Sequence, residues 1–79
     1  MEIAYKRQYE QLQVYIEGYL HLQIKLLDFI GFQSWIHGEN EYFIEYYFKG
    51  GDKITTAYGY KDKWCKILEI LDKAIIVKG

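Results

Sequence analysis

The feature that most constrains the fold is a strict alternation in residues 11–27, QLQVYIEGYLHLQIKLL. The even positions from 12 to 26 are apolar except Gly18, and the odd positions from 13 to 25 are polar or tyrosine. This is the period of a half-buried β-strand. The same letters also lay an apolar stripe at helical spacing. The segment is therefore either a hairpin that turns at Glu17-Gly18 or part of one long helix.

We expect the helix, because helical periodicity extends over residues 5–30, whereas the alternation covers only the second half of that range. On a helical wheel most polar residues fall on one side, with Val14 and Ile24 as apolar misfits among them. Gln, Glu, Lys and Leu are good helix formers. Glu17-Gly18 is a mediocre hairpin turn, since Asn-Gly or Asp-Gly is the usual choice. The hairpin stays open as the alternative.

The rest of the chain predicts a three-stranded meander followed by a second helix. Strands are expected at Phe32–His37, Tyr42–Phe48 and Ile54–Tyr58, because these runs are rich in aromatic and β-branched residues and are bounded by turn residues. The amphipathic run Lys61–Val77 predicts the helix. The predicted fold is α+β in the order α-β-β-β-α, with a long N-terminal helix and a single domain over residues 1–79.

Composition limits the location and the partners of the chain. The formal net charge is −1, so no overall field draws it to nucleic acid or to a membrane. Cys65 is the only cysteine, which excludes an intrachain disulfide and fits a reducing compartment. The sequence shows neither a signal-peptide pattern nor an apolar span of about 20 residues. We expect a cytoplasmic protein that does not enter membranes.

The sequence offers little chemistry. Ser34 is the only serine and falls in a predicted strand among bulky residues, while Cys65 falls at the edge of the apolar face of the predicted C-terminal helix. His37 stands near two glutamates, but such short-range clusters are mostly solvated turns. We therefore predict no enzymatic activity, no catalytic residues, no metal and no cofactor.

The predicted central strand points to a binding surface. If its Ile44 side is the core, the opposite side is open and carries aromatic residues with one carboxylate among them. Aromatic patches with a few polar groups are typical of protein-binding surfaces. The residues expected to bind a partner protein are Trp35, Phe43, Glu45, Tyr47 and Tyr58.

Two further sets of residues carry weaker predictions. Lys49 and Lys53 flank two glycines and are candidates for contacts to a phosphate or another small ligand, although a simple hairpin turn explains them as well. With 19% aromatic residues, some of the apolar surface is expected to meet a second copy of the chain. A helical stripe at spacing 3, 4, 3 would form that homodimer contact: Tyr9, Leu12, Ile16 and Tyr19.

The hypothesis that follows is a small protein-interaction module, an inhibitor or an adaptor. In size, absence of motifs and a Lys-, Tyr- and Ile-rich make-up, the chain resembles the small inhibitors that bacterial viruses or mobile elements encode against host defence systems. That resemblance is one of style and includes no matched residues. Alternative hypotheses are a homo-oligomer that binds a small molecule or nucleotide and, second, a nucleic-acid-binding protein.

Overall fold

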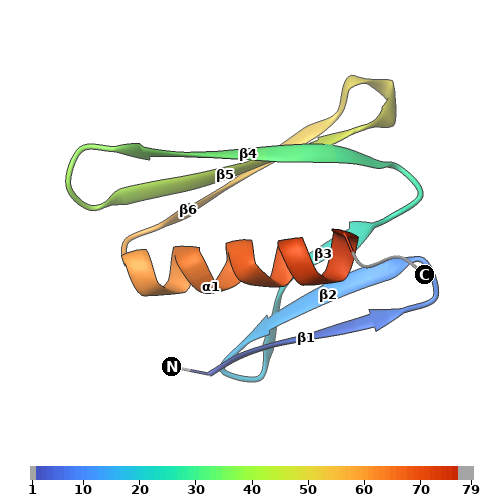
Figure 1. Ribbon diagram of the computed structural model, residues 1–79, viewed down its shortest axis with the longest axis horizontal. Coiled ribbons are helices and arrows are strands. Elements are labelled where there is room, and N and C mark those ends of the chain that lie inside the picture. The colour runs from blue at the N-terminus through green and yellow to red at the C-terminus, as the bar shows by residue number, and fades with distance from the viewer. Residues whose placement is uncertain (1, 77–79) are drawn as a thin grey trace. The chain divides into compact units, whose positions relative to one another are not determined.

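The computed structural model describes residues 2–76, which contain two three-stranded antiparallel sheets and one α-helix (Figure 1). The elements in chain order are β1 (Ile3–Gln8), β2 (Gln11–Ile16), β3 (Tyr19–Lys25), β4 (Phe29–His37), β5 (Glu41–Phe48), a 3-10 turn (Lys49–Gly51), β6 (Lys53–Tyr58), α1 (Lys61–Leu71) and a π-helical turn (Asp72–Ile76). They divide into two compact units. The first joins the chain up to Leu27 to the chain from Lys66 onward, and the second is Asp28–Cys65.

The first unit overturns the predicted N-terminal helix. Residues 3–25 form the meander β1-β2-β3, and the hairpin at Glu17-Gly18 is the correct reading of the alternation. Both turn residues have a left-handed backbone, with φ of 53° at Glu17 and 84° at Gly18. Two successive positive φ angles are the hallmark of the type I′ turn, whose twist matches that of the flanking strands. A second tight turn places Tyr9 at φ 58°.

Burial in the first unit follows the period of two. Val14 and Ile24, the misfits of the helical wheel, are completely buried, because both lie on the same side of the sheet as Leu12. Residues of the C-terminal segment in the same unit complete its apolar core, and they are spaced as on one side of a helix: Ile67, Ile70, Leu71 and Ala74. The strand pattern therefore accounts for Val14 and Ile24, which the helical wheel placed on the polar side.

The second unit has the predicted meander, in the order β4-β5-β6. β4 begins at Phe29, three residues before the predicted strand, and carries a bulge between Phe29 and Gly31. The buried side of this sheet contains Ile44, Tyr46 and Tyr58. The hydroxyl of Tyr46 lies 3.3 Å from that of Thr56, so the buried tyrosine keeps a hydrogen-bond partner.

The start of α1 is attached to the second sheet through Trp64. Its indole Nε1 donates a hydrogen bond to the carbonyl oxygen of Phe43 at 3.0 Å, and its ring lies 5.4 Å from that of Tyr42. The carboxylate of Asp62 in the first turn interacts favourably with the positive end of the helix dipole. The helix was predicted to reach Val77, which lies outside the described residues.

Replacing Gly18 by alanine distinguishes a hairpin from a helix, because the change in protein stability has opposite signs in the two structures. In a helix interior the change would stabilise the protein by about 1 kcal/mol. In the hairpin it forces a Cβ into a left-handed backbone and should destabilise the protein by about 1 kcal/mol, which lowers the melting temperature by roughly 4–8 °C.

Thermal unfolding followed by circular dichroism measures this difference. Gly31→Ala is the matched control, because Gly31 has no left-handed φ and a Cβ there meets no atom within 4 Å. A Gly18→Ala protein that melts higher than the wild type would contradict the turn.

Candidate protein-interaction face

One side of the β4-β5-β6 sheet gathers most of the residues predicted to bind a partner. Cross-strand pairing puts three rows on this side, Trp35 with Phe43 and Ala57, Gln33 with Glu45 and Thr55, and Gly31 with Tyr47 and Lys53. We call these nine residues the aromatic face. The opposite side of the same strands contains the buried Ile44 and Tyr46, so the alternation of β5 decides which aromatic residues stay accessible.

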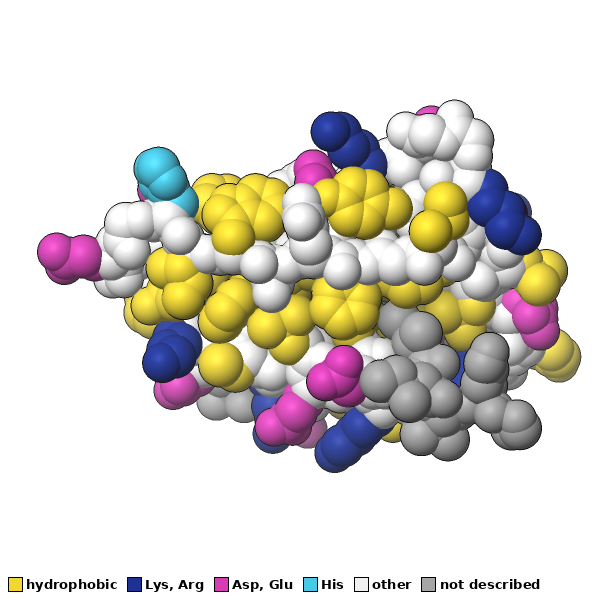
Figure 2. All heavy atoms as spheres, turned by 45° about the horizontal axis from the view of Figure 1, so that its top comes forward, with side chains coloured by type: hydrophobic (Ala, Val, Ile, Leu, Met, Phe, Trp, Pro, Cys, Tyr) yellow, Lys and Arg dark blue, Asp and Glu magenta, His cyan; other side chains and the backbone are white. Residues whose placement is uncertain are grey.

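The apolar part of the aromatic face is a pair of stacked rings. The ring centroids of Trp35 and Phe43 lie 5.3 Å apart with an interplanar angle of 18°. Trp35 keeps 37% of its surface exposed, and Phe43 is half-buried. Figure 2 shows hydrophobic side chains (yellow) gathered over this sheet, with white polar and magenta acidic atoms among them. A flat aromatic surface is thus held in place by its own strand pairing.

The polar part of the face centres on the carboxylate of Glu45. Tyr47 donates its hydroxyl hydrogen to Glu45 Oε1 at 2.5 Å, and Thr55 donates to Oε2 at 3.1 Å. Gln33 Nε2 donates to the Tyr47 hydroxyl at 2.5 Å and lies 3.4 Å from Glu45 Oε1. Lys53 Nζ lies 3.8 Å from Oε2, although 64% of the Lys53 side chain remains exposed. The Glu45 side chain is only 15% exposed and is surrounded by donors.

These donors change the acidity of two groups. The hydrogen bond from Tyr47, aided by those from Thr55 and Gln33 and by the Lys53 ammonium, holds the pKa of Glu45 below its usual value. The same carboxylate raises the pKa of Tyr47, because the phenol would lose its acceptor and gain a like charge on ionising. At neutral pH the face therefore carries an ionised Glu45 next to the stacked rings, with the Lys53 ammonium 3.8 Å from it.

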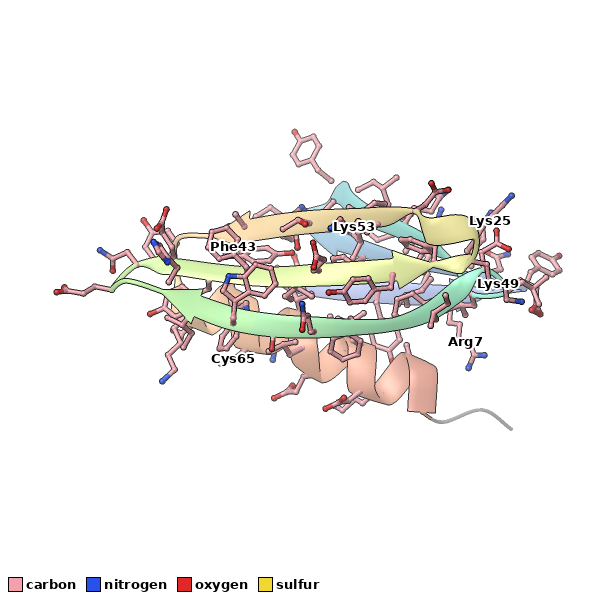
Figure 3. The ribbon with its side chains drawn as sticks, turned by 90° about the horizontal axis from the view of Figure 1, so that it is seen from above. Arg7, Lys25, Phe43, Lys49, Lys53 and Cys65 are labelled. Atoms are coloured by element: carbon pink, nitrogen blue, oxygen red, sulfur yellow. The ribbon has the colours of Figure 1, made fainter. Side chains whose placement is uncertain are left out.

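Tyr58 does not join the aromatic face. It pairs with Tyr42 on the other side of the sheet and is only 5% exposed, and burial raises its pKa. Lys49 and Lys53, the two candidates for phosphate contacts, lie in different parts of the second unit. Lys49 lies in the turn after β5, whereas Lys53 lies on the aromatic face beside Glu45 (Figure 3).

The proposed self-association stripe loses its geometry with the N-terminal helix. Tyr9 and Tyr19 lie at the two hairpin turns and are 88% and 80% exposed, whereas Leu12 is buried in the core of the first unit. Ile16 is half-buried at the end of β2. Residues that shared one side of a helix are distributed over a turn and two strands, so the stripe is not available as a seam.

Sequence reasoning missed Gln33, which links the Tyr47 hydroxyl to the edge strand. The role of Gln33 depends on the strand pairing, which the sequence does not give directly. Once β4 and β5 are paired, Gln33 lies opposite Glu45. Sequence reasoning also missed a shallow hollow of about 320 Å³ in the first unit, lined by Glu2, Ala4, Lys6, Tyr15 and Gly18. There the Lys6 ammonium lies 5.7 Å from the centre of the Tyr15 ring.

Residues 2–76 offer neither a metal-binding group nor a membrane-spanning helix. No three His, Cys, Asp or Glu side chains of the described chain are grouped in a way that would hold a metal ion. His37 lies 3.9 Å from Glu41, and both side chains are largely exposed. Within the described part of the chain, no helix has the length and apolar character needed to cross a membrane.

Comparison of the chain with protein-family models, with curated proteins and with solved structures gives no match.

The lowered pKa of Glu45 predicts a particular loss of stability in acid. A group whose folded-state pKa is depressed contributes stability above its unfolded pKa and loses that contribution as the pH falls through the folded pKa. Between about pH 6 and pH 3 the wild type should therefore lose more thermal stability than Glu45→Gln does. Melting temperatures across this range measure the difference. Glu39→Gln, in the turn between β4 and β5, is the control and should follow the wild type. If the melting temperatures of Glu45→Gln and the wild type fell equally with pH, the stabilisation of ionised Glu45 by its hydrogen bonds would be contradicted.

Proposed function

We propose that this chain is a small, non-enzymatic interaction module that binds a partner protein through the aromatic face. The observation that carries the proposal is the stacked Trp35–Phe43 pair beside the hydrogen-bonded carboxylate of Glu45. Binding hot spots are typically rigid aromatic groups, enriched in Trp and Tyr, at the centre of a surface with polar groups around them. The face has both elements on one rigid strand pair, so little side-chain freedom is left to be lost on binding.

A protein suits this surface better than a small ligand. Small molecules bind in concave sites that enclose most of their surface, whereas the aromatic face lies on the open side of a three-stranded sheet. Tyr58, one of the aromatic residues expected to bind, is buried on the other side of the sheet, so its ring is not open to a nucleotide base.

Binding without chemistry leaves two roles, inhibitor and adaptor, and we propose that the chain acts in one of them in the cytoplasm. The exposed thiol of Cys65 is compatible with a reducing compartment. The likeness in size and composition to virus-encoded inhibitors makes proteins of host defence systems the first partners to test. Such an inhibitor needs only to cover a functional surface of its target.

Adding a bulky charge to the face should abolish binding without disturbing the fold. Ala57 is exposed and lies directly opposite Phe43, so Ala57→Arg covers the aromatic pair while every contact of the sheet remains in place. We expect the tagged wild type to capture one stoichiometric partner from host lysate and the variant to capture none. The complex should then be rebuilt from the two purified proteins, and its affinity compared for both forms.

Leu27→Arg is the matched control, because Leu27 is also an exposed apolar residue, at 64%, and lies outside the aromatic face. It should bind as the wild type does, and both variants should melt within a few degrees of it. Equal binding by Ala57→Arg and the wild type would refute the face. A rise in melting temperature with a panel of nucleotides, equivalent to about 2.7 kcal/mol at a hundredfold excess over the dissociation constant, would favour the ligand-binding alternative instead.

A further inference from the structure

The four edge strands of the two sheets are not equally protected against pairing with another strand. Natural sheets block their edges with charged side chains, lysine above all, because an open edge presents unpaired N–H and C=O groups. β1 carries Lys6 and Arg7, β3 carries Lys25 and β6 carries Lys53. β4, FIGFQSWIH, has no Lys, Arg, Asp, Glu or Pro in nine residues. It is the longest strand of the described chain and the one edge there without such protection.

β4 also exposes apolar side chains along this edge. Ile30 is 65% exposed, Ile36 52% and Trp35 37%. The bulge at Ile30 leaves Gly31–His37 as the regular part of the edge, and an antiparallel pair centred on Gln33 uses Gly31–Trp35 of it. An uncharged, apolar edge of this length is a surface for pairing with a further strand.

The order of residues in β4 suits an antiparallel pair of two copies centred on Gln33. In that register Gln33 meets Gln33 of the second copy, Phe32 meets Ser34, and Gly31 meets Trp35. A Cβ at Gly31 would meet nothing within 4 Å, so there is open space into which the indole of the other copy fits. Covering a strand glycine with a cross-strand aromatic ring is a recognised way to stabilise a sheet. No charged side chain faces a like charge, since the strand carries none.

We propose that β4 is a self-association edge and pairs with β4 of a second copy in this register to form a homodimer. A two-fold axis at Gln33 makes the contact isologous, so one uncharged strand satisfies both sides. The two β4-β5-β6 sheets then become one six-stranded sheet, and the two aromatic faces lie on the same side of it. A single strand pair falls at the small end of specific interfaces, which bury about 1,200–2,000 Å², so the dimer should dissociate on dilution. This proposal does not rest on the proposed function.

Cysteine cross-linking tests the register directly. In a Cys65→Ser background, which removes the exposed native thiol, Gln33→Cys should form a covalent dimer under mild oxidation. Residues directly opposite in an antiparallel pair have Cα atoms about 4.5–5.5 Å apart, within the range that a disulfide bridges. Thr55→Cys is the control, because Thr55 lies in the same row of the same face but on the other edge strand. It should remain monomeric in non-reducing electrophoresis.

Sedimentation at several concentrations tests the affinity. Gly31→Lys with Gln33→Lys gives β4 the charges that the other edges have, and should weaken the dimer by at least about tenfold. Thr55→Lys with Ala57→Lys adds the same charge to β6 and should leave the dimer unchanged. A wild type that stays monomeric at about 200 µM, or Thr55→Cys that cross-links as readily as Gln33→Cys, would overturn the proposal. If Ala57→Arg loses partner capture but still forms the dimer, the result supports partner binding by the aromatic face and leaves the β4 dimer unaffected.

Discussion

The two-residue turn at Glu17-Gly18, together with the register shift at Val14/Tyr15 that follows it, determines which side chains of the first unit are buried. Because side chains alternate along a strand, a shift of the pairing by one residue would exchange the buried and the exposed sets. The turn pairs Ile16 with Tyr19, and its backbone is fixed from both sides. Glu17 N donates to the carbonyl of Glu2 at 2.8 Å, while the Glu17 carboxylate accepts from Glu2 N at 2.7 Å. The turn therefore ties β1 to the β2-β3 hairpin and starts its pairing, and the register shift at Val14/Tyr15 then places Val14 opposite Leu22 and Leu12 opposite Ile24.

How much of the fold could be read from the sequence differs between the two halves. The meander and the C-terminal helix followed from aromatic strands, glycine-rich turns and a helical apolar stripe, which are unambiguous signals. Residues 3–25 fit both the period of a strand and that of a helix, and the residues at the turns did not favour the strand. Tyr9 and Glu17 adopt left-handed backbones that residue preferences assign to Gly, Asn or Asp. Here cross-strand burial of Val14 and Ile24 prevailed over local preference.

The candidate site was predictable wherever a single strand decides it. Phe43, Glu45 and Tyr47 share a side because they alternate along β5, and Trp35 joins them through a pairing that the short turn makes nearly certain. Tyr58 was misplaced because its side depends on the register of β6, which the turn Lys49–Gly51 fixes through the pairing of Tyr42 with Tyr58. Gln33 was missed for the related reason that its importance lies in its neighbours across the sheet.

In the proposed binding, the polar centre of the aromatic face would contribute specificity rather than strength. An exposed pair of stacked rings alone would associate with any apolar surface, but Glu45 lies in the next row with its charge fixed by hydrogen bonds. A partner that covers the rings would also desolvate this carboxylate, whose two oxygens already have donors within the chain, so a further donor from the partner would strengthen the contact. Lys53 covers part of that requirement from within the chain and can turn away, since most of its side chain is exposed. If the face binds a partner as proposed, it would favour apolar surfaces that bring a hydrogen-bond donor over those that do not.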